Sequence, residues 1–122
     1  MKLIYVASPY AGDIERNTEF AKRACLFVKN EGCAFFAPHL LYPQVLDDND
    51  PEDRQYALET GKEILEWCDE LWVFGDIISS GMEAEIRRAE DSEIPVRYVS
   101  EQELAERERP FAERHPFCSM RI

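Results

Sequence analysis

Two glutamates that follow a serine-rich turn have the residue types and spacing most suited to chemistry in this chain. Residues 79–86 read Ser-Ser-Gly-Met-Glu-Ala-Glu-Ile and follow an apolar run at 71–74 that is typical of a buried strand. A strand, a short turn with glycine and then a helix point backbone N–H groups at a ligand. A carboxylate there is stabilised by the helix dipole, which suits a group that attacks as an anion. Glutamates at a helix start are equally typical of ordinary capping.

Strands and helices alternate along the chain and would position this motif. Buried strands are predicted at 2–7, 33–37, 70–74 and 95–99, with amphipathic helical patterns between them. The alternation predicts an α/β fold, a single doubly wound Rossmann-like or flavodoxin-like domain with a central parallel sheet of four to five strands. We expect this domain to span residues 1–106 and a polar, proline-broken tail to follow at 107–122.

Ligands of such sheets bind beyond the carboxyl ends of the strands, and four segments of this chain are predicted to lie there. They are residues 8–12, 39–44, 76–81 and those that follow residue 99. The connection over residues 38–50 is long and partly apolar, so we expect it to fold back as a flap. Its acidic end could bind a metal, but Asp50 followed by Pro51 is more typical of a helix start.

The composition narrows the classes of partner. The chain has 122 residues and a net charge of −11, which argues against nucleic acid polymers and anionic membranes but permits a small nucleotide. Its four cysteines form no C-x-x-C pair and there are two histidines, so we predict no metal site and no cofactor. The chain shows no signal peptide and no apolar run of membrane length, which predicts a cytoplasmic protein.

Four stretches of the sequence together resemble a known family. They read I-Y-V-A-S-P-Y at residues 4–10, A-P-H-L-L-Y-P-Q at 37–44, C-D-E-L-W-V-F-G at 68–75 and S-x-G-M-x-x-E-I at 79–86. In this order they resemble the nucleoside 2-deoxyribosyltransferase-like superfamily over residues 2–99. They are most similar to its uncharacterised bacterial and phage branch.

The resemblance implies which residues are catalytic. The nucleophile of the family is a glutamate four residues after a glycine, which selects Glu85 after Gly81. Glu83 lies two positions earlier, about 200° around a helix, and is expected to face away. Tyr5 matches a strand tyrosine that contacts the nucleophile and the sugar in the family. A core aromatic residue is the alternative interpretation of Tyr5.

The resemblance also implies a substrate site, with a phosphate near the serine-rich turn. Ser79 stands where the branch that hydrolyses deoxynucleoside 5′-monophosphates has a phosphate-binding serine, and where the transferases have an aspartate. We therefore expect a monophosphate to bind better than its nucleoside. His39 is a candidate proton donor for the leaving base, or else a turn residue after Pro38. The predicted substrate-binding residues are Ser8, Tyr10, His39, Gln44, Ser79, Ser80, Gly81 and Met82.

Two positions depart from the family pattern and leave more than one function open. Gly61 stands where the family has the acid that assists the departing base, and Arg87 stands where it tends to have glycine. The implied activity is cleavage or transfer of the N-glycosidic bond of a nucleoside or nucleotide by Glu85. A nucleotide-binding module without turnover and a homo-oligomeric scaffold are the alternatives. The tail residues Phe111, Phe117 and Met120, with the resemblance, predict a homo-oligomer.

Overall fold

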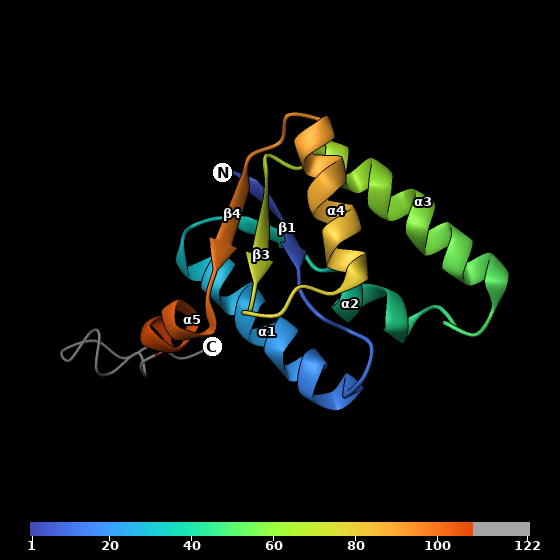
Figure 1. The fold of residues 1–122 in the computed structure, drawn as a ribbon, viewed down its shortest axis with the longest axis horizontal. Helices are drawn as coiled ribbons and strands as arrows, with labels where there is room; N and C mark the ends of the chain where they lie inside the picture. The colour runs from blue at the N-terminus through green and yellow to red at the C-terminus, as the bar shows by residue number, and fades with distance from the viewer. Residues whose placement is uncertain (109–122) are drawn as a thin grey trace.

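A four-stranded parallel sheet forms the centre of the protein, which we describe from a computed structural model over residues 1–108. The strands lie in the order β2-β1-β3-β4, and all three pairings are parallel (Figure 1). The strands are β1 (Leu3–Ala7), β2 (Ala34–Phe36), β3 (Glu70–Phe74) and β4 (Val96–Val99). This architecture confirms the predicted doubly wound α/β fold with a sheet of four to five strands.

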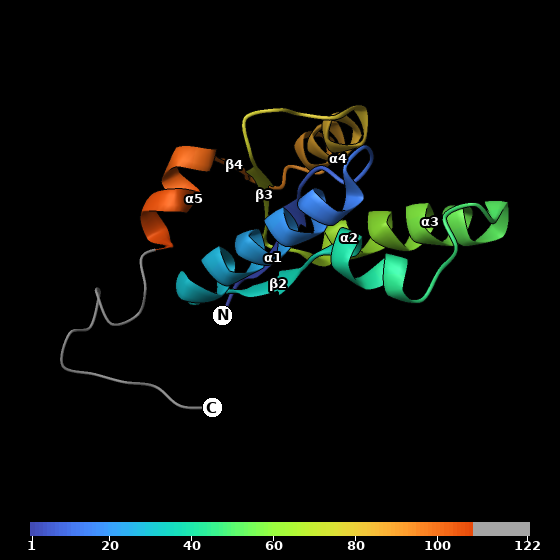
Figure 2. The ribbon, with the colours of Figure 1, turned by 90° about the horizontal axis from the view of Figure 1, so that it is seen from below.

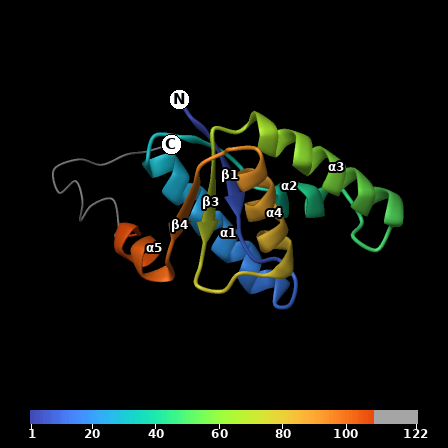
Figure 3. The ribbon, with the colours of Figure 1, turned by 45° about the horizontal axis from the view of Figure 1, so that its top comes forward.

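Helices cover both faces of this sheet. They are α1 (Ile14–Asn30), α2 (Pro38–Leu41), α3 (Pro51–Trp67), α4 (Ser80–Asp91) and α5 (Glu101–Arg107). Helices α3 and α4 lie side by side, as Figures 1 and 3 both show. Helix α5 follows β4 at the other end of the molecule from α3 (Figure 2). The sheet thus has an α1–α5 side and an α3–α4 side.

The alternation of side chains along the strands decides which residues reach each side of the sheet. In β1, Ile4 and Val6 pack into the core with α1 and α5. Tyr5 and Ala7 pack into the second core cluster with residues of α3 and α4. All four side chains are buried. Because Tyr5 belongs to the second cluster, its hydroxyl group is directed towards α3 and α4 and away from α1.

Polar side chains accept hydrogen bonds at the starts of α1, α3 and α5, and the start at Asp50 is the one that the sequence predicts. The carboxylates of Asp13 and Asp50 accept hydrogen bonds from the backbone N–H groups of the first turns of α1 and α3. The Ser100 hydroxyl accepts one from the backbone N–H of Glu103 at 3.1 Å. The Glu103 carboxylate forms an ion pair with Arg97. Ser100 therefore caps α5, while the Glu103 side chain is engaged with Arg97.

The connection between β2 and α3 differs from the predicted flap. It folds locally into α2 and a 3₁₀ turn, η1 (Tyr42–Gln44). Pro38 is buried at the start of α2, where its fixed φ and missing N–H are compatible with a helix. The Tyr42 hydroxyl lies 2.7 Å from the Thr60 hydroxyl of α3, which attaches the connection to that helix. The segment is therefore a folded wall beside α3.

Ion pairs attach the end of the described chain to α1 and the turn after it. Arg107 of α5 pairs with Glu31, and Glu108 pairs with Arg23. The last helix thus includes Arg107, one residue past the predicted domain limit. Residues 109–122, with the tail aromatics, lie outside the described residues. Within residues 1–108, no helix is both long and apolar enough to span a membrane.

Candidate active site

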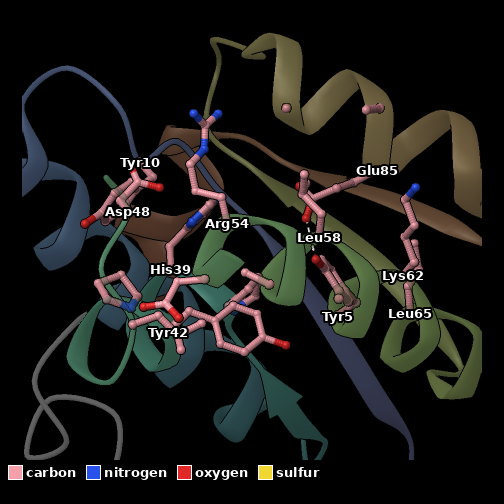
Figure 4. A pocket seen from close by; sticks show the side chains of 18 of the residues that line it. Tyr5, Tyr10, His39, Tyr42, Asp48, Arg54, Leu58, Lys62, Leu65 and Glu85 are labelled. Carbon is pink, nitrogen blue, oxygen red and sulfur yellow. Dashed lines mark hydrogen bonds between the residues drawn. The ribbon is translucent and has the colours of Figure 1, made fainter. Parts of the chain in front are cut away.

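A cavity of about 500 Å³ lies between α3, α4 and the folded connection α2–η1 (Figure 4). Strand β1 contributes Tyr5, and the segment that follows this strand contributes Tyr10. The connection and the loop after it contribute Pro38, His39, Tyr42, Pro43, Leu46, Asp47, Asp48 and Asn49. Helix α3 contributes Asp53, Arg54, Ala57, Leu58, Gly61, Lys62 and Leu65, and helix α4 contributes Gly81, Ala84, Glu85 and Arg88.

A hydrogen bond between β1 and α4 joins the two predicted catalytic residues. The hydroxyl group of Tyr5 donates to Oε2 of Glu85 at 2.5 Å. The Tyr5 ring is buried, and it packs against Phe36 with ring centroids 5.5 Å apart. Glu85 reaches the cavity from the second turn of α4. Glu83 is exposed and does not line the cavity. One carboxyl group and one phenol therefore meet at the cavity wall.

Burial controls the protonation of this pair. It raises the pKa of the Glu85 carboxyl to about 7, although the hydrogen bond from Tyr5 and the charge of Arg88 both act to lower it. Burial, followed by the charge of Glu85, raises the pKa of the Tyr5 hydroxyl far above its ordinary value. At neutral pH the tyrosine is therefore protonated, and the Glu85 carboxyl is divided between its acid and carboxylate forms.

The expectation that the helix dipole keeps Glu85 ionised is wrong. The effect of the dipole falls off within the first turn of a helix, and Glu85 lies in the second turn of α4. The loss of water around a buried carboxylate outweighs what remains of it. Glu83, in the first turn, occupies the position where the dipole acts.

An aromatic pair forms another part of the cavity wall. The rings of Tyr10 and His39 stack with centroids 5.1 Å apart and planes 17° from parallel. Burial lowers the pKa of His39, and the charge of Asp48 opposes this shift. At neutral pH His39 is therefore mostly the uncharged imidazole, and its ring presents a flat surface together with Tyr10.

Gly61 lies where a side chain would face the hydrogen-bonded pair of Tyr5 and Glu85. It is buried in α3, and a Cβ atom at this position would lie 3.6 Å from the hydroxyl oxygen of Tyr5, which is ordinary contact. The α3 neighbours Ala57, Leu58 and Leu65 line the same cavity and are apolar. The wall beside Tyr5 and Glu85 is thus built without a carboxyl group from α3.

Five of the ten predicted site residues do not line the cavity. Ser79 caps α4, its hydroxyl accepting from the backbone N–H of Met82 at 3.2 Å. Met82 itself is buried in the core, and Ser80 is exposed at the first position of α4. Ser8 is buried after β1, and Gln44 is exposed and donates to a backbone carbonyl one turn earlier. The structure brings together Tyr5, Tyr10, His39, Gly81 and Glu85.

Several lining residues were not predicted from the sequence. Arg54, Leu58 and Lys62 are spaced four residues apart on α3, and Arg88 lies three residues after Glu85 on α4. Residues at this spacing lie on one face of a helix, and this spacing is the sequence signal from which their place in the cavity could have been predicted. Among the described residues, no ion-pair partner within 4.0 Å is found for any of the three cations. Asp69, before β3, accepts a hydrogen bond from the backbone N–H of Leu3 at 2.7 Å.

Solved structures with this fold include two 2-deoxyribosyltransferases. The enzyme from Bacillus psychrosaccharolyticus superposes with a TM-score of 0.69 at 21% identity, over 80% of this chain and 72% of that one. The enzyme from Leishmania mexicana gives a TM-score of 0.62 at 15% identity, over 95% of this chain and 72% of that one. A conserved protein from Enterococcus faecalis gives a TM-score of 0.56 at 20% identity, over 80% of this chain and 62% of that one. At these identities the likeness shows a shared fold.

Sequence comparisons give a family but no curated relative. No curated protein matches the chain. The sequence pattern of a domain of unknown function, DUF7768, matches residues 2–99, which is most of the chain and includes the whole sheet. The chain therefore belongs to the DUF7768 family.

Proposed function

We propose that this protein cleaves or transfers the N-glycosidic bond of a nucleoside or deoxynucleoside, or of its 5′-monophosphate, with Glu85 as the nucleophile. The hydrogen bond from Tyr5 to Glu85 inside the cavity is the observation that carries this proposal. The fold shared with two 2-deoxyribosyltransferases supports the same reaction class. Tyr10, which follows the carboxyl end of β1, and residues that follow β2 also line the cavity, and ligands of doubly wound sheets bind at this edge.

The reaction would proceed through a covalent intermediate. The Glu85 carboxylate attacks the anomeric carbon, the base departs with the electrons of the C–N bond, and a glycosyl ester of Glu85 forms. Water or a second base then takes the sugar and releases the carboxylate. Because the pKa of Glu85 is raised to about 7, a substantial fraction of the free protein holds the reactive carboxylate at neutral pH. The Tyr5 hydroxyl orients that carboxylate.

The substrate would occupy the cavity between the aromatic pair and α4. Tyr10 and His39 offer a flat surface on which a base can stack. A phosphate would lie towards the start of α4, where Gly81 lines the cavity and supplies a backbone N–H group. We therefore expect a nucleoside monophosphate to bind more tightly than the nucleoside. Calorimetry with each pair of ligands tests this preference, and equal affinities would contradict it.

Base release by matched variants tests the proposed activity. The wild type, Glu85→Gln and Glu83→Gln would be assayed with nucleosides, deoxynucleosides and their 5′-monophosphates. We expect Glu85→Gln to lose about a thousandfold or more in rate, as expected for a covalent nucleophile. Glu83→Gln, an exposed neighbour on the same helix, should remain active. Full activity of Glu85→Gln would contradict the mechanism. A wild type that binds these ligands and releases no base would be a binding module.

A further inference from the structure

The departing base poses a problem that the wall beside Glu85 does not solve. A neutral nucleoside expels its base with a negative charge on nitrogen unless a proton reaches the base in the transition state. The α3 wall beside the hydroxyl of Tyr5 consists of Gly61, Ala57, Leu58 and Leu65. These four residues have no side-chain proton to give.

Among the other proton-bearing side chains of the described cavity, the Tyr42 hydroxyl lies 2.7 Å from the Thr60 hydroxyl, and three more are poorly suited to this task. Tyr5 already donates to Glu85, and its raised pKa makes it a weak acid. His39 stacks on Tyr10, and its lowered pKa leaves few protons on the ring at neutral pH. Figure 4 shows the ammonium group of Lys62 and the carboxyl group of Glu85 pointing in different directions.

The two arginines of the cavity, Arg54 and Arg88, are not proton donors in catalysis. A guanidinium group keeps its protons throughout the pH range of proteins. Together with Lys62 they line the cavity from the two helices, where they suit the anionic part of a nucleotide. The wall beside Tyr5 and Glu85 has no acid from α3, which favours a substrate whose base can leave without receiving a proton.

The loop wall of the cavity has the features that a positively charged ring requires. Asp47 and Asp48 line it beside Asp53 of α3, and two of these carboxylates already accept hydrogen bonds from backbone N–H groups of the loop, at 2.9 Å for Asp47 and 2.8 Å for Asp53. Asp48 accepts none from the described residues, and its charge acts on the ring of His39. A flat cation is attracted both by a carboxylate and by the faces of stacked aromatic rings.

We propose that the substrate of this cavity is a nucleoside or nucleotide whose leaving base carries a positive charge on a quaternary ring nitrogen. N7-alkylated purines and N-ribosylpyridinium compounds belong to this class. The inference rests on the proposed function and specifies its substrate. A carboxylate oxygen of Glu85 bonds to the anomeric carbon, the C–N bond breaks, and its electron pair neutralises the base, which leaves without a proton. Water then attacks the same carbon, which releases the sugar, the carboxylate and one proton to solvent.

A pair of substrates that differ in one methyl group tests the inference. Base release from 7-methylguanosine and guanosine, and from their 5′-monophosphates, would be measured for the wild type and divided by the uncatalysed rate of each compound. We expect the wild type to accelerate cleavage of the methylated compound at least tenfold more than cleavage of guanosine. Equal or greater acceleration of guanosine cleavage would overturn the inference.

Substitution of Gly61 provides a second test of the inferred substrate class. Gly61→Asp places an acid beside the Tyr5 hydroxyl, where a Cβ atom has ordinary contact distance, and Gly61→Asn has the same shape without the acid. We expect Gly61→Asp to raise guanosine cleavage about tenfold relative to Gly61→Asn and to leave cleavage of 7-methylguanosine within a few-fold. Equal guanosine rates in the two variants would overturn the inference.

Failure of the inference and failure of the proposed function give different results. Release of both bases with a glycosyl ester on Glu85, but without preference for the methylated compound, would overturn the inference alone. Absence of base release from every compound, with no ester detected by intact mass, would overturn the proposed function and the inference with it.

Discussion

At the scale of single residues, the burial of Glu85 opposes its ionisation while Tyr5 supports it. The carboxyl group is desolvated, which raises its pKa, and the hydroxyl of Tyr5 donates a hydrogen bond that lowers it. A carboxylate with few hydrogen bonds is a reactive nucleophile, since less solvation has to be removed before it attacks. In the proposed mechanism, the burial around Tyr5 would thus also make the Glu85 carboxylate more reactive towards the sugar.

Replacement of Glu85 should change how stability depends on pH. The pKa of Glu85 is about 7 in the folded state against an ordinary value of 4.5, so folding favours the protonated form. The wild type should therefore lose stability as pH rises through the window from 4.5 to 7. Glu85→Gln lacks this loss. From pH 5 to pH 8, the free energy of unfolding of Glu85→Gln should therefore increase by about 2 kcal/mol relative to that of the wild type.

Urea unfolding at the two pH values checks this expectation. Glu83→Gln is the control, because this carboxyl group is exposed on the same helix. A wild type and a Glu85→Gln variant whose stabilities change in parallel from pH 5 to pH 8 would show that Glu85 titrates like an exposed acid.

Removal of the Tyr5 hydroxyl should move the pH profile of activity. Tyr5→Phe deletes the hydrogen bond that favours the Glu85 carboxylate, so the pKa of Glu85 should rise further. For the wild type, kcat/KM should increase with pH around a midpoint near 7. In Tyr5→Phe that midpoint should lie higher, and kcat/KM at pH 7 should fall by about tenfold or more.

Tyr42→Phe is the matched control for this experiment. It deletes a hydroxyl that contacts Thr60 in the same cavity wall, and should leave the midpoint of the profile in place. A profile of Tyr5→Phe with the wild-type midpoint would contradict the assigned role of the hydrogen bond.

At the scale of elements, the start of α4 sets the position of Glu85. The Ser79 hydroxyl accepts from the backbone N–H of Met82 and so fixes the first turn. Ser79→Ala should lower the free energy of unfolding by about 1 kcal/mol, the usual cost of losing a cap. Ser80→Ala, one residue later at an exposed position, should cost much less. Urea unfolding of both variants measures the difference, and equal losses would show that the capping bond contributes nothing.

The strands were predictable from the sequence, while the connection after β2 was not. The run at 70–74 is apolar on both faces, which is typical of a covered parallel strand, and it forms β3 with the predicted bounds. Residues 38–50 were predicted to form a flap because the connection is long and partly apolar. Packing of Tyr42 against Thr60 instead holds a short helix and a 3₁₀ turn in place.

The cavity shows a similar division between local and long-range information. Motif positions such as Glu85 and Gly81 could be read from the chain. The lining by Arg54 and Lys62 depends on how α3 is rotated about its axis, and this rotation follows from packing of Leu65 against the sheet. At the serine turn, a motif residue that could be read from the chain does not line the cavity. The hydroxyl of Ser79 instead accepts a hydrogen bond from the backbone of α4. Sequence patterns do not show such competition between local and ligand hydrogen bonds.

At the scale of the whole molecule, we propose that the protein is a homo-oligomer. The predicted contribution of tail residues such as Phe111 lies outside the described chain, but the described part also exposes large apolar side chains. Trp67 at the end of α3 is 69% exposed and Ile77 after β3 is 79% exposed. Apolar side chains of this size often contact a partner surface.

Light scattering should therefore give at least twice the chain mass of 14.2 kDa at tens of micromolar protein, roughly the range in which weak dimers form. Because the net charge is −11 and copies repel each other, the dimer should strengthen with added salt. A monomeric mass at high salt and high protein concentration would contradict the proposal.

The central proposal is that Glu85, which is half-buried at the cavity wall, bonds covalently to the sugar. Mass spectrometry of the intact protein during turnover, followed by peptide mapping, measures this directly. The proposed mechanism predicts a glycosyl adduct on the peptide that contains Glu85, absent from Glu85→Gln and present in Glu83→Gln. Base release by the wild type with an adduct on another residue, or with unchanged turnover in Glu85→Gln, would contradict it.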